Sequence, residues 1–154
     1  MFEGEPQHFV VGDTFPLGCP FSPKIVYSHY FAANPDLQNP AFQKDLCGIY
    51  RPGIGLDSVC MSWGHDEYLY HVVKQYLPEE AAYIIRYHSF YACHRDGAYQ
   101  YLMNERDHRL MLNVCDFNSY DLYSKSDPPA DDDLELASYY QALIAKFFPP
   151  QITW

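Results

Sequence analysis

The sequence predicts an all-α protein whose first third is rich in loops. Three observations support this class: apolar residues recur at helical spacing beyond Leu56, no segment shows the apolar–polar alternation of a half-buried strand, and turn-forming residues gather upstream of Leu56. Apolar residues make up 48% of the 154 residues, which suffices for the core of one domain. We therefore expect a single domain over residues 1–154, with loops over 1–55 and helices over 56–154.

Residues 1–55 are rich in proline, glycine, asparagine and aspartate. Examples are Asn34-Pro35-Asp36, Asn39-Pro40 and Arg51-Pro52-Gly53-Ile54-Gly55. These residues favour turns, because proline restricts its own backbone, glycine allows positive φ, and Asn and Asp side chains bond to nearby amides. We expect extended loops here, with one short helix near residues 40–47.

A helix is predicted over residues 62–75. Apolar or aromatic side chains and one histidine recur there at helical spacing: His65, Tyr68, Leu69, Val72, Val73 and Tyr76. This spacing lines one face of an α-helix, so the histidine lies on the apolar stripe.

The next helix is expected to start at Pro78. Proline suits a first helical position, and Glu79 and Glu80 follow it, where carboxylates interact favourably with the helix dipole. The stripe of this helix comprises Ala81, Ile84, Ile85 and His88. We interpret residues 91–97 as a break and expect a further helix at about 98–104.

Two more helices complete the prediction. One covers about 107–124, is stopped by Asp127-Pro128-Pro129, and has on one face Leu110, Val114, Phe117 and Asp121. The run Asp131–Asp133 is expected to cap the last helix. That helix ends at Pro149-Pro150, and its apolar face comprises Leu136, Tyr140, Leu143 and Phe147.

The composition argues against several classes of protein. A net charge of −10, with ten scattered lysines and arginines, argues against binding to nucleic acid. No run approaches the roughly 18 apolar residues of a membrane span, and residues 1–6 lack the features of a signal peptide. The five cysteines are widely spaced without a C-x-x-C pair, so we expect reduced thiols. The sequence thus predicts a cytoplasmic protein that binds neither nucleic acid nor membranes.

Three residues of metal-binding type lie on the predicted apolar stripes. Asp121 continues the stripe of its helix, and an unpaired buried carboxylate costs on the order of several kcal/mol, so it requires a cation, a set of donors or a metal. His65 and His88 raise the same question on two other helices. Taken singly, the aspartate has a buried salt bridge or a capping contact as its alternative, and each histidine has an ordinary core position. Together they are the ligand types of non-haem iron, and the pattern alone leaves both readings open.

Four longer segments carry a specific resemblance. They are Val11-Gly12-Asp13-Thr14-Phe15-Pro16, Ser62-Trp63-Gly64-His65-Asp66-Glu67-Tyr68, Arg86-Tyr87-His88-Ser89-Phe90-Tyr91 and Phe117-Asn118-Ser119-Tyr120-Asp121-Leu122-Tyr123-Ser124-Lys125. On these segments the chain resembles myo-inositol oxygenase, a di-iron family of the HD-domain superfamily. The resemblance runs from about Gly4 to Trp154 and matches the C-terminal part of that family. It implies an HD-domain-like helical bundle, incomplete on its N-terminal side.

The resemblance also implies roles for individual residues. The metal ligands would be His65, His88 and Asp121. The residues in contact with a polyol substrate would be Gly12, Asp13, His88, Ser89 and Lys125. Asp66 does not belong to the defining His-Asp doublet of the superfamily; it either orients a ligand or is an ordinary acid in the first turn of a helix.

By resemblance, the protein is an oxidoreductase of inositol catabolism that uses two irons and O2 to cleave the ring of myo-inositol, giving D-glucuronate. The first iron-binding histidine and the His-Asp doublet of the family are expected upstream of Met1, so we expect negligible oxygenase activity from this chain alone. Exposed apolar faces are then expected to favour self-association. The alternative is a non-catalytic remnant or partner-binding fragment of the same family. An HD-type phosphohydrolase is disfavoured, because it needs the same doublet and the sequence has no basic cluster for a phosphate.

Overall fold

The computed structural model describes residues 12–121 and 134–152. Within these ranges the chain forms helices and loops but no β-strand, which confirms the all-α class. Pro16 and Met61 form an isolated antiparallel bridge between two loop segments. None of the described helices has the length and hydropathy needed to span a bilayer.

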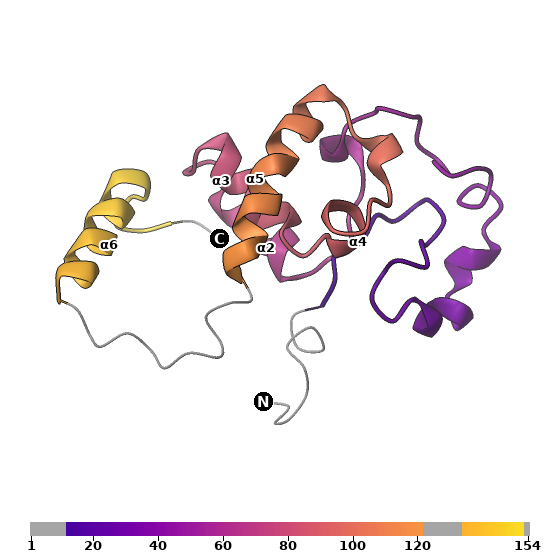
Figure 1. Ribbon diagram of the computed structural model, residues 1–154, viewed down its shortest axis with the longest axis horizontal. Coiled ribbons are helices and arrows are strands. Elements are labelled where there is room, and N and C mark those ends of the chain that lie inside the picture. The colour runs from indigo at the N-terminus through magenta and orange to yellow at the C-terminus, as the bar shows by residue number, and fades with distance from the viewer. Residues whose placement is uncertain (1–11, 122–133, 153–154) are drawn as a thin grey trace.

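The described helices follow one another along the chain as drawn in Figure 1. The α-helices are α2 (His65–Val73), α3 (Glu79–Tyr87), α4 (Tyr91–His94), α5 (Glu105–Asp121) and α6 (Leu134–Phe147). The 3-10 helices are η1 (Ser28–Ala33), η2 (Pro35–Gln38), η3 (Leu56–Ser58) and η4 (Gln100–Leu102).

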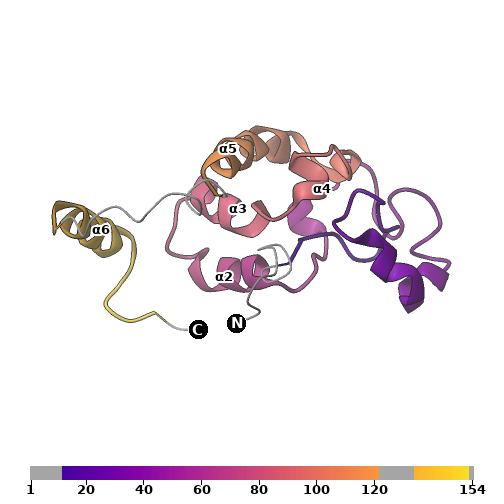
Figure 2. The same ribbon diagram turned by 60° about the horizontal axis from the view of Figure 1, so that its bottom comes forward.

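Helix α3 forms the centre of the helical part. It packs against α2 on one side and α5 on the other, and α4 packs against α5, as Figure 2 shows. The core between these elements contains side chains that are completely buried, among them Leu56, Tyr87, Phe90, Leu102 and Val114. In both views α6 is set apart from these helices. A ring contact joins its end to the rest, because Phe148 lies 5.7 Å from Tyr76 between ring centroids.

The buried faces of α2 and α3 differ from the predicted apolar stripes. In α2 the buried residues are Asp66, Glu67, Val72 and Val73, whereas Leu69 is exposed. In α3 they are Ala82, Tyr83, Arg86 and Tyr87, whereas the predicted stripe is only half-buried. The predicted stripe of α2 is confirmed only for Val72 and Val73, and that of α3 is wrong, because charged side chains that pair with one another are buried between the two helices.

Two predicted helices are replaced by shorter structure. Residues 40–47 form turns, in which Asn39 Oδ1 accepts from the Ala41 amide at 3.0 Å and Asp45 Oδ1 accepts from the Cys47 amide at 2.8 Å. Such local bonds compete with a helix. The helix predicted at 98–104 is reduced to η4, which follows a left-handed Tyr99 with φ 61°.

Other boundaries also shift. The predicted break over 91–97 contains the short helix α4, and Pro78 caps α3 and is not its first helical residue. Helix α5 begins at Glu105, before the predicted start at 107. Residues 122–124 of that prediction and the Asp131–Asp133 cap lie outside the described residues.

A capping box explains the start of α5. Asn104 Oδ1 accepts from the Asp107 amide at 3.0 Å, and Asp107 Oδ2 accepts from the Asn104 amide at 3.0 Å. Each side chain thereby satisfies a backbone donor that the first turn of a helix leaves without a partner. Asp107 also accepts from the Leu56 amide and the Tyr83 hydroxyl, at 2.8 and 3.1 Å, so it joins η3, α3 and α5.

Candidate functional site

The packing of α2 on α3 brings two predicted ligands together. His65 is the first residue of α2, and His88 directly follows α3. Their Nε2 atoms lie 3.1 Å apart. His65 is exposed and His88 is half-buried, so the pair lies at the surface of the α2–α3 contact, where an ion has access.

The hydrogen bonds of His88 determine its tautomer. Nδ1 lies 2.9 Å from the backbone oxygen of Ile85, which can only accept, so Nδ1 carries the proton and Nε2 presents a lone pair. A backbone partner of this kind is typical of histidines that bind metals. The backbone oxygen of His88 in turn accepts from His94 Nε2 at 2.9 Å.

The spacing of the two histidines fits a shared metal ion. Imidazole nitrogens bind transition metals at about 2.1 Å, so two of them at roughly a right angle around one ion are about 3 Å apart. The observed separation of 3.1 Å between the Nε2 atoms agrees with this geometry. The two Nε2 atoms, which lie within hydrogen-bond distance of each other, are therefore also at a spacing that one metal ion could bridge.

Asp121, the third predicted ligand, does not complete the set among the described residues. It lies at the last described position of α5, one helical turn after Phe117, whose ring centroid is 6.2 Å from that of His88. In residues 12–121 and 134–152 no three His, Cys, Asp or Glu side chains gather closely enough to hold a metal ion. The structure thus brings two of the three predicted ligands together.

A hydrogen bond to Asp66 connects α2 to the loop that contains Gly12 and Asp13. Both Asp66 and Thr14 are buried, and the Thr14 hydroxyl donates to Asp66 Oδ2. The other carboxylate oxygen accepts from the Glu67 amide at 3.0 Å. The Thr14 amide donates to the backbone oxygen of Ser89 at 3.0 Å. Thr14 therefore joins the loop to both histidine-bearing segments.

The predicted polyol contacts lie next to this junction. Ser89 is buried, and its Oγ is 3.4 Å from His65 Nε2. Gly12 has φ 77°, a left-handed conformation that favours glycine. Lys125 lies outside the described residues.

Asp13 combines burial with an unsatisfied oxygen. Its Oδ2 accepts from the Val26 amide at 3.0 Å, whereas its buried Oδ1 has no hydrogen-bond partner within the described part of the chain. Burial raises the pKa of Asp13 to about 6, although the Val26 amide and the charge of Arg95 act in the opposite direction. Asp13 Oδ1 is therefore a buried acceptor without a donor in the described part of the chain.

Three residues of this region were not identified from the sequence: Thr14, Glu67 and Arg86. Arg86 and Glu67 form a buried bidentate ion pair, with Nε–Oε2 at 2.7 Å and Nη2–Oε1 at 2.9 Å. Burial raises the pKa of Glu67, but its bonds with Arg86 and His71 outweigh this and hold it below its ordinary value. The signal for Arg86 is a charged residue directly after Ile84 and Ile85 in a helix.

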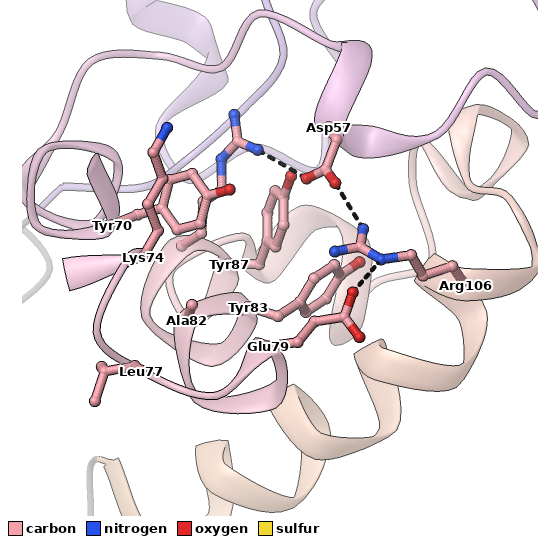
Figure 3. Close-up of a pocket in the computed structure, with 10 residues that line it drawn as sticks. Asp57, Tyr70, Lys74, Leu77, Glu79, Ala82, Tyr83, Tyr87 and Arg106 are labelled. Carbon is pink, nitrogen blue, oxygen red and sulfur yellow. Dashed lines mark hydrogen bonds and ion pairs between the residues drawn. The ribbon is translucent and has the colours of Figure 1, made fainter. Parts of the chain in front are cut away.

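Arg86 of this ion pair also lines a separate cavity of about 300 Å³, whose lining residues are drawn in Figure 3. Its walls include Arg86, Asp57, Arg106 and the ring of Tyr87, whose buried hydroxyl has no partner within the described part of the chain. Among the residues that the structure describes, no predicted ligand or polyol contact lines this cavity.

Comparisons with known proteins agree on one family. The sequence model described as myo-inositol oxygenase matches residues 1–154. Inositol oxygenase from Dictyostelium discoideum is 47% identical over 99% of this chain and 53% of its own length. Inositol oxygenase 1 from Arabidopsis thaliana is 49% identical over 97% of this chain and 48% of its own length. Inositol oxygenase from Danio rerio is 49% identical over 97% of this chain and 55% of its own length. The chain spans about half the length of the curated relatives it matches.

Proposed function

The chain belongs to the myo-inositol oxygenase family, and from this premise we propose that it supplies part of the iron site of an inositol oxygenase. The reaction is the O2-dependent cleavage of the ring of myo-inositol to D-glucuronate. The observation that supports the proposal is the approach of His65 and His88, whose Nε2 atoms are 3.1 Å apart, with His88 in the tautomer whose Nε2 carries a lone pair.

His65 and His88 would bind iron through Nε2, with Asp121 as the carboxylate ligand. When bound, iron supplies a Lewis acid for the hydroxyls of the substrate and a site for the activation of O2. Two histidines and one carboxylate form the ligand set of one non-haem iron. The second iron of a di-iron site needs ligands beyond these three.

The polyol would be held beside the histidines by residues of two segments. Asp13 Oδ1 would accept a hydrogen bond from a hydroxyl, since it is a buried acceptor without a partner in the described chain. Ser89 Oγ would bond to a second hydroxyl next to His65. The backbone of Gly12 permits close approach, and Lys125 completes the proposed contacts.

We propose negligible turnover by this chain alone, because a single two-histidine site lacks the remaining ligands of a di-iron centre. A partner-binding fragment of the same family is the second candidate function. Exposed aromatic side chains favour it: Trp63, just before α2, is 71% exposed, and Tyr120 of α5 is 68% exposed. A cytoplasmic location is also proposed, and the five unpaired cysteines agree with it.

Anaerobic binding of myo-inositol tests the proposed function. The chain, loaded with Fe(II) without oxygen, is expected to give saturation-transfer NMR signals from myo-inositol but not from an open-chain hexitol. Asp13→Ala should abolish these signals, whereas the exposed Asp116→Ala should not. Equal signals from both polyols, or from wild type and Asp13→Ala, would contradict the proposed substrate site.

A further inference from the structure

The buried ion pair of Glu67 and Arg86 bridges the same two helices as the histidine pair. Glu67 lies two residues after His65 in α2, and Arg86 lies two residues before His88 at the end of α3. Side chains two residues apart on an α-helix are separated by about 200° around the helix axis. The ion pair and the histidine pair therefore join α2 and α3 on opposite sides of their contact.

The geometry of the ion pair restricts rotation of both helices. The planar guanidinium of Arg86 makes two parallel bonds to the carboxylate of Glu67, at 2.7 and 2.9 Å, which defines the orientation of both groups. A rotation of α2 about its axis breaks these bonds and moves His65 away from His88. Apolar side chains of similar size often hold two helices together equally well, but they lack the two directional bonds of the guanidinium.

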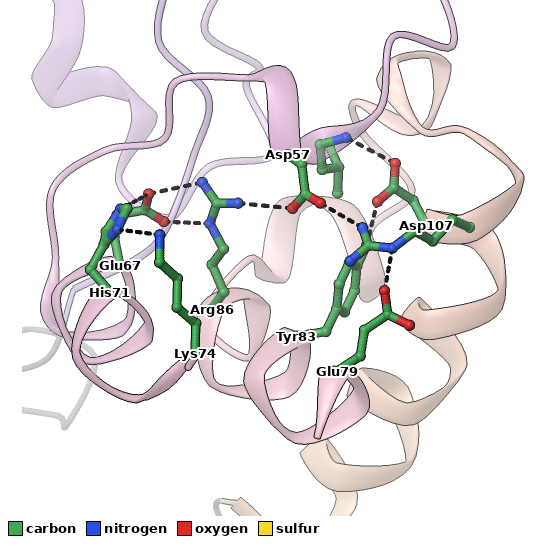
Figure 4. Close-up of polar contacts among 10 residues, drawn as sticks. Asp57, Glu67, His71, Lys74, Glu79, Tyr83, Arg86 and Asp107 are labelled. Atoms are coloured by element: carbon green, nitrogen blue, oxygen red, sulfur yellow. Dashed lines mark hydrogen bonds and ion pairs between the residues drawn. The ribbon is translucent and has the colours of Figure 1, made fainter. Parts of the chain in front are cut away.

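Further contacts hold Arg86 in place (Figure 4). Its Nη1 donates to Asp57 Oδ1 at 3.0 Å. Its guanidinium also lies 4.5 Å from the ring centroid of Tyr70. The other carboxylate oxygen of Asp57, Oδ2, accepts from Arg106 Nη1 at 2.7 Å. Arg106 Nε in turn donates to Glu79 Oε1 at 2.6 Å. Arg106 and Glu79 belong to α5 and α3 and are partly exposed, so this end of the network does not reach α2.

We propose that Glu67 and Arg86 are positioning residues that set the distance between the two histidine ligands. The inference rests on the metal site proposed above, since its purpose is to keep two Nε2 atoms at the spacing that one ion requires. Neither Glu67 nor Arg86 would contact the ion or the substrate itself.

Cobalt(II) titration of matched variants tests the proposal. Arg86→Lys keeps the positive charge but removes the planar guanidinium and its two parallel hydrogen bonds. It is expected to weaken Co(II) affinity by about tenfold, as is typical when a residue that supports a metal ligand is replaced. Arg106→Lys is the matched control within the same network, and is expected to change the affinity less than about twofold. Equal affinities of the two variants would overturn the proposal.

A double variant separates positioning from stability. Glu67→Met with Arg86→Met replaces the ion pair by apolar side chains of similar length and is expected to fold, because such replacements of buried pairs are tolerated. Its thermal unfolding should remain cooperative while its Co(II) affinity falls as in Arg86→Lys. Affinity at the wild-type level in this variant would show that helix packing alone sets the spacing.

The spacing of the rings is also measurable without metal. Nuclear Overhauser effects between the ring protons of His65 and His88 are expected in the wild-type chain and in Arg106→Lys, and should be lost in Arg86→Lys. A wild-type chain that keeps these signals but does not bind Co(II) would contradict the metal proposal alone. Signals that persist in Arg86→Lys would contradict the positioning role whatever the metal does.

Discussion

Asp13 connects the chemistry of the proposed substrate site to stability. Its carboxylate is buried, one oxygen is bonded to the Val26 amide, and the other has no partner within the described chain. Burial of a charge disfavours the ionised form, which is why the pKa of Asp13 is raised to about 6. The folded protein thus keeps a buried acceptor without a donor and loses some stability by doing so.

The Asp13 carboxyl is expected to make stability fall as the pH rises from about 4 to 6. In this window the folded state binds the proton more tightly than the unfolded state, whose pKa is near 3.8, so unfolding releases a proton. Asp13→Asn removes the cost of burying an ionised carboxylate. It should therefore raise the free energy of unfolding at pH 7 by on the order of 1 kcal/mol, after allowance for screening by solvent. Thermal unfolding across this pH range measures the effect.

The exposed Asp116→Asn on α5 is the control for this prediction, and its profile should follow that of the wild-type chain. If the Asp13→Asn and wild-type profiles run parallel from pH 4 to 7, the pKa of Asp13 is not raised in the folded protein.

At the scale of elements, two buried aspartates join segments that are distant in sequence. Asp107 accepts from Leu56, Tyr83 and Asn104, and so connects η3, α3 and the start of α5. Asp66 accepts from Thr14, and so connects α2 to the loop with Asp13. Each acceptor satisfies donors that are otherwise buried without a partner, and this makes each aspartate sensitive to replacement.

Asp107→Ala is expected to destabilise the protein by about 3 kcal/mol, because the Tyr83 hydroxyl and the Leu56 amide lose a buried acceptor and α5 loses its capping box. Urea unfolding measures this difference. Asp116→Ala, an exposed position of the same helix, should change stability by less than about 0.5 kcal/mol. Similar losses for both variants would contradict the role of Asp107.

Thr14→Val is expected to destabilise the protein by about 1–3 kcal/mol. The substitution preserves the shape of the side chain but leaves one oxygen of the buried Asp66 carboxylate without its donor. Thr14→Ser keeps the hydroxyl and should retain most of the stability. Equal unfolding midpoints for the Val and Ser variants would show that the hydroxyl does not stabilise this junction.

Periodicity predicted that helices occur near α2, α3, α5 and α6 but not which faces of α2 and α3 are buried. Glu67 and Arg86 are charged, so a hydrophobic pattern assigns them to solvent, yet each is the partner that permits burial of the other. Such pairs depend on contacts between segments, which one sequence does not display. The segments around His65 and His88 were predictable because their motifs are long, whereas the role of Thr14 depends on the position of its loop.

At the scale of the molecule, several apolar side chains remain exposed on the helical layer. A groove of about 490 Å³ lies between α3 and α5, and its walls include Ala81, Ile84, Phe117 and Tyr120. Leu69 of α2 is also exposed. Exposed apolar surface of this kind favours association.

The chain is expected to self-associate in a concentration-dependent manner through these side chains. Leu69→Lys combined with Tyr120→Lys should shift sedimentation velocity profiles towards the monomer, because a charge on an apolar contact surface opposes its burial. Ile49→Lys, at an exposed apolar position in the loop region, is the control and should leave the profile unchanged. A monomeric wild-type chain at all concentrations would contradict the expectation.

Iron content after anaerobic reconstitution tests whether His65 and His88 form a metal site. The wild-type chain is expected to retain about one iron, since the Nε2 atoms of the two proposed ligands are at a spacing that one ion could bridge. His65→Ala and His88→Ala should each lose it, whereas the exposed His108→Ala should retain it. A wild-type chain without iron, or one whose iron content is unchanged by removal of either histidine, would contradict the account.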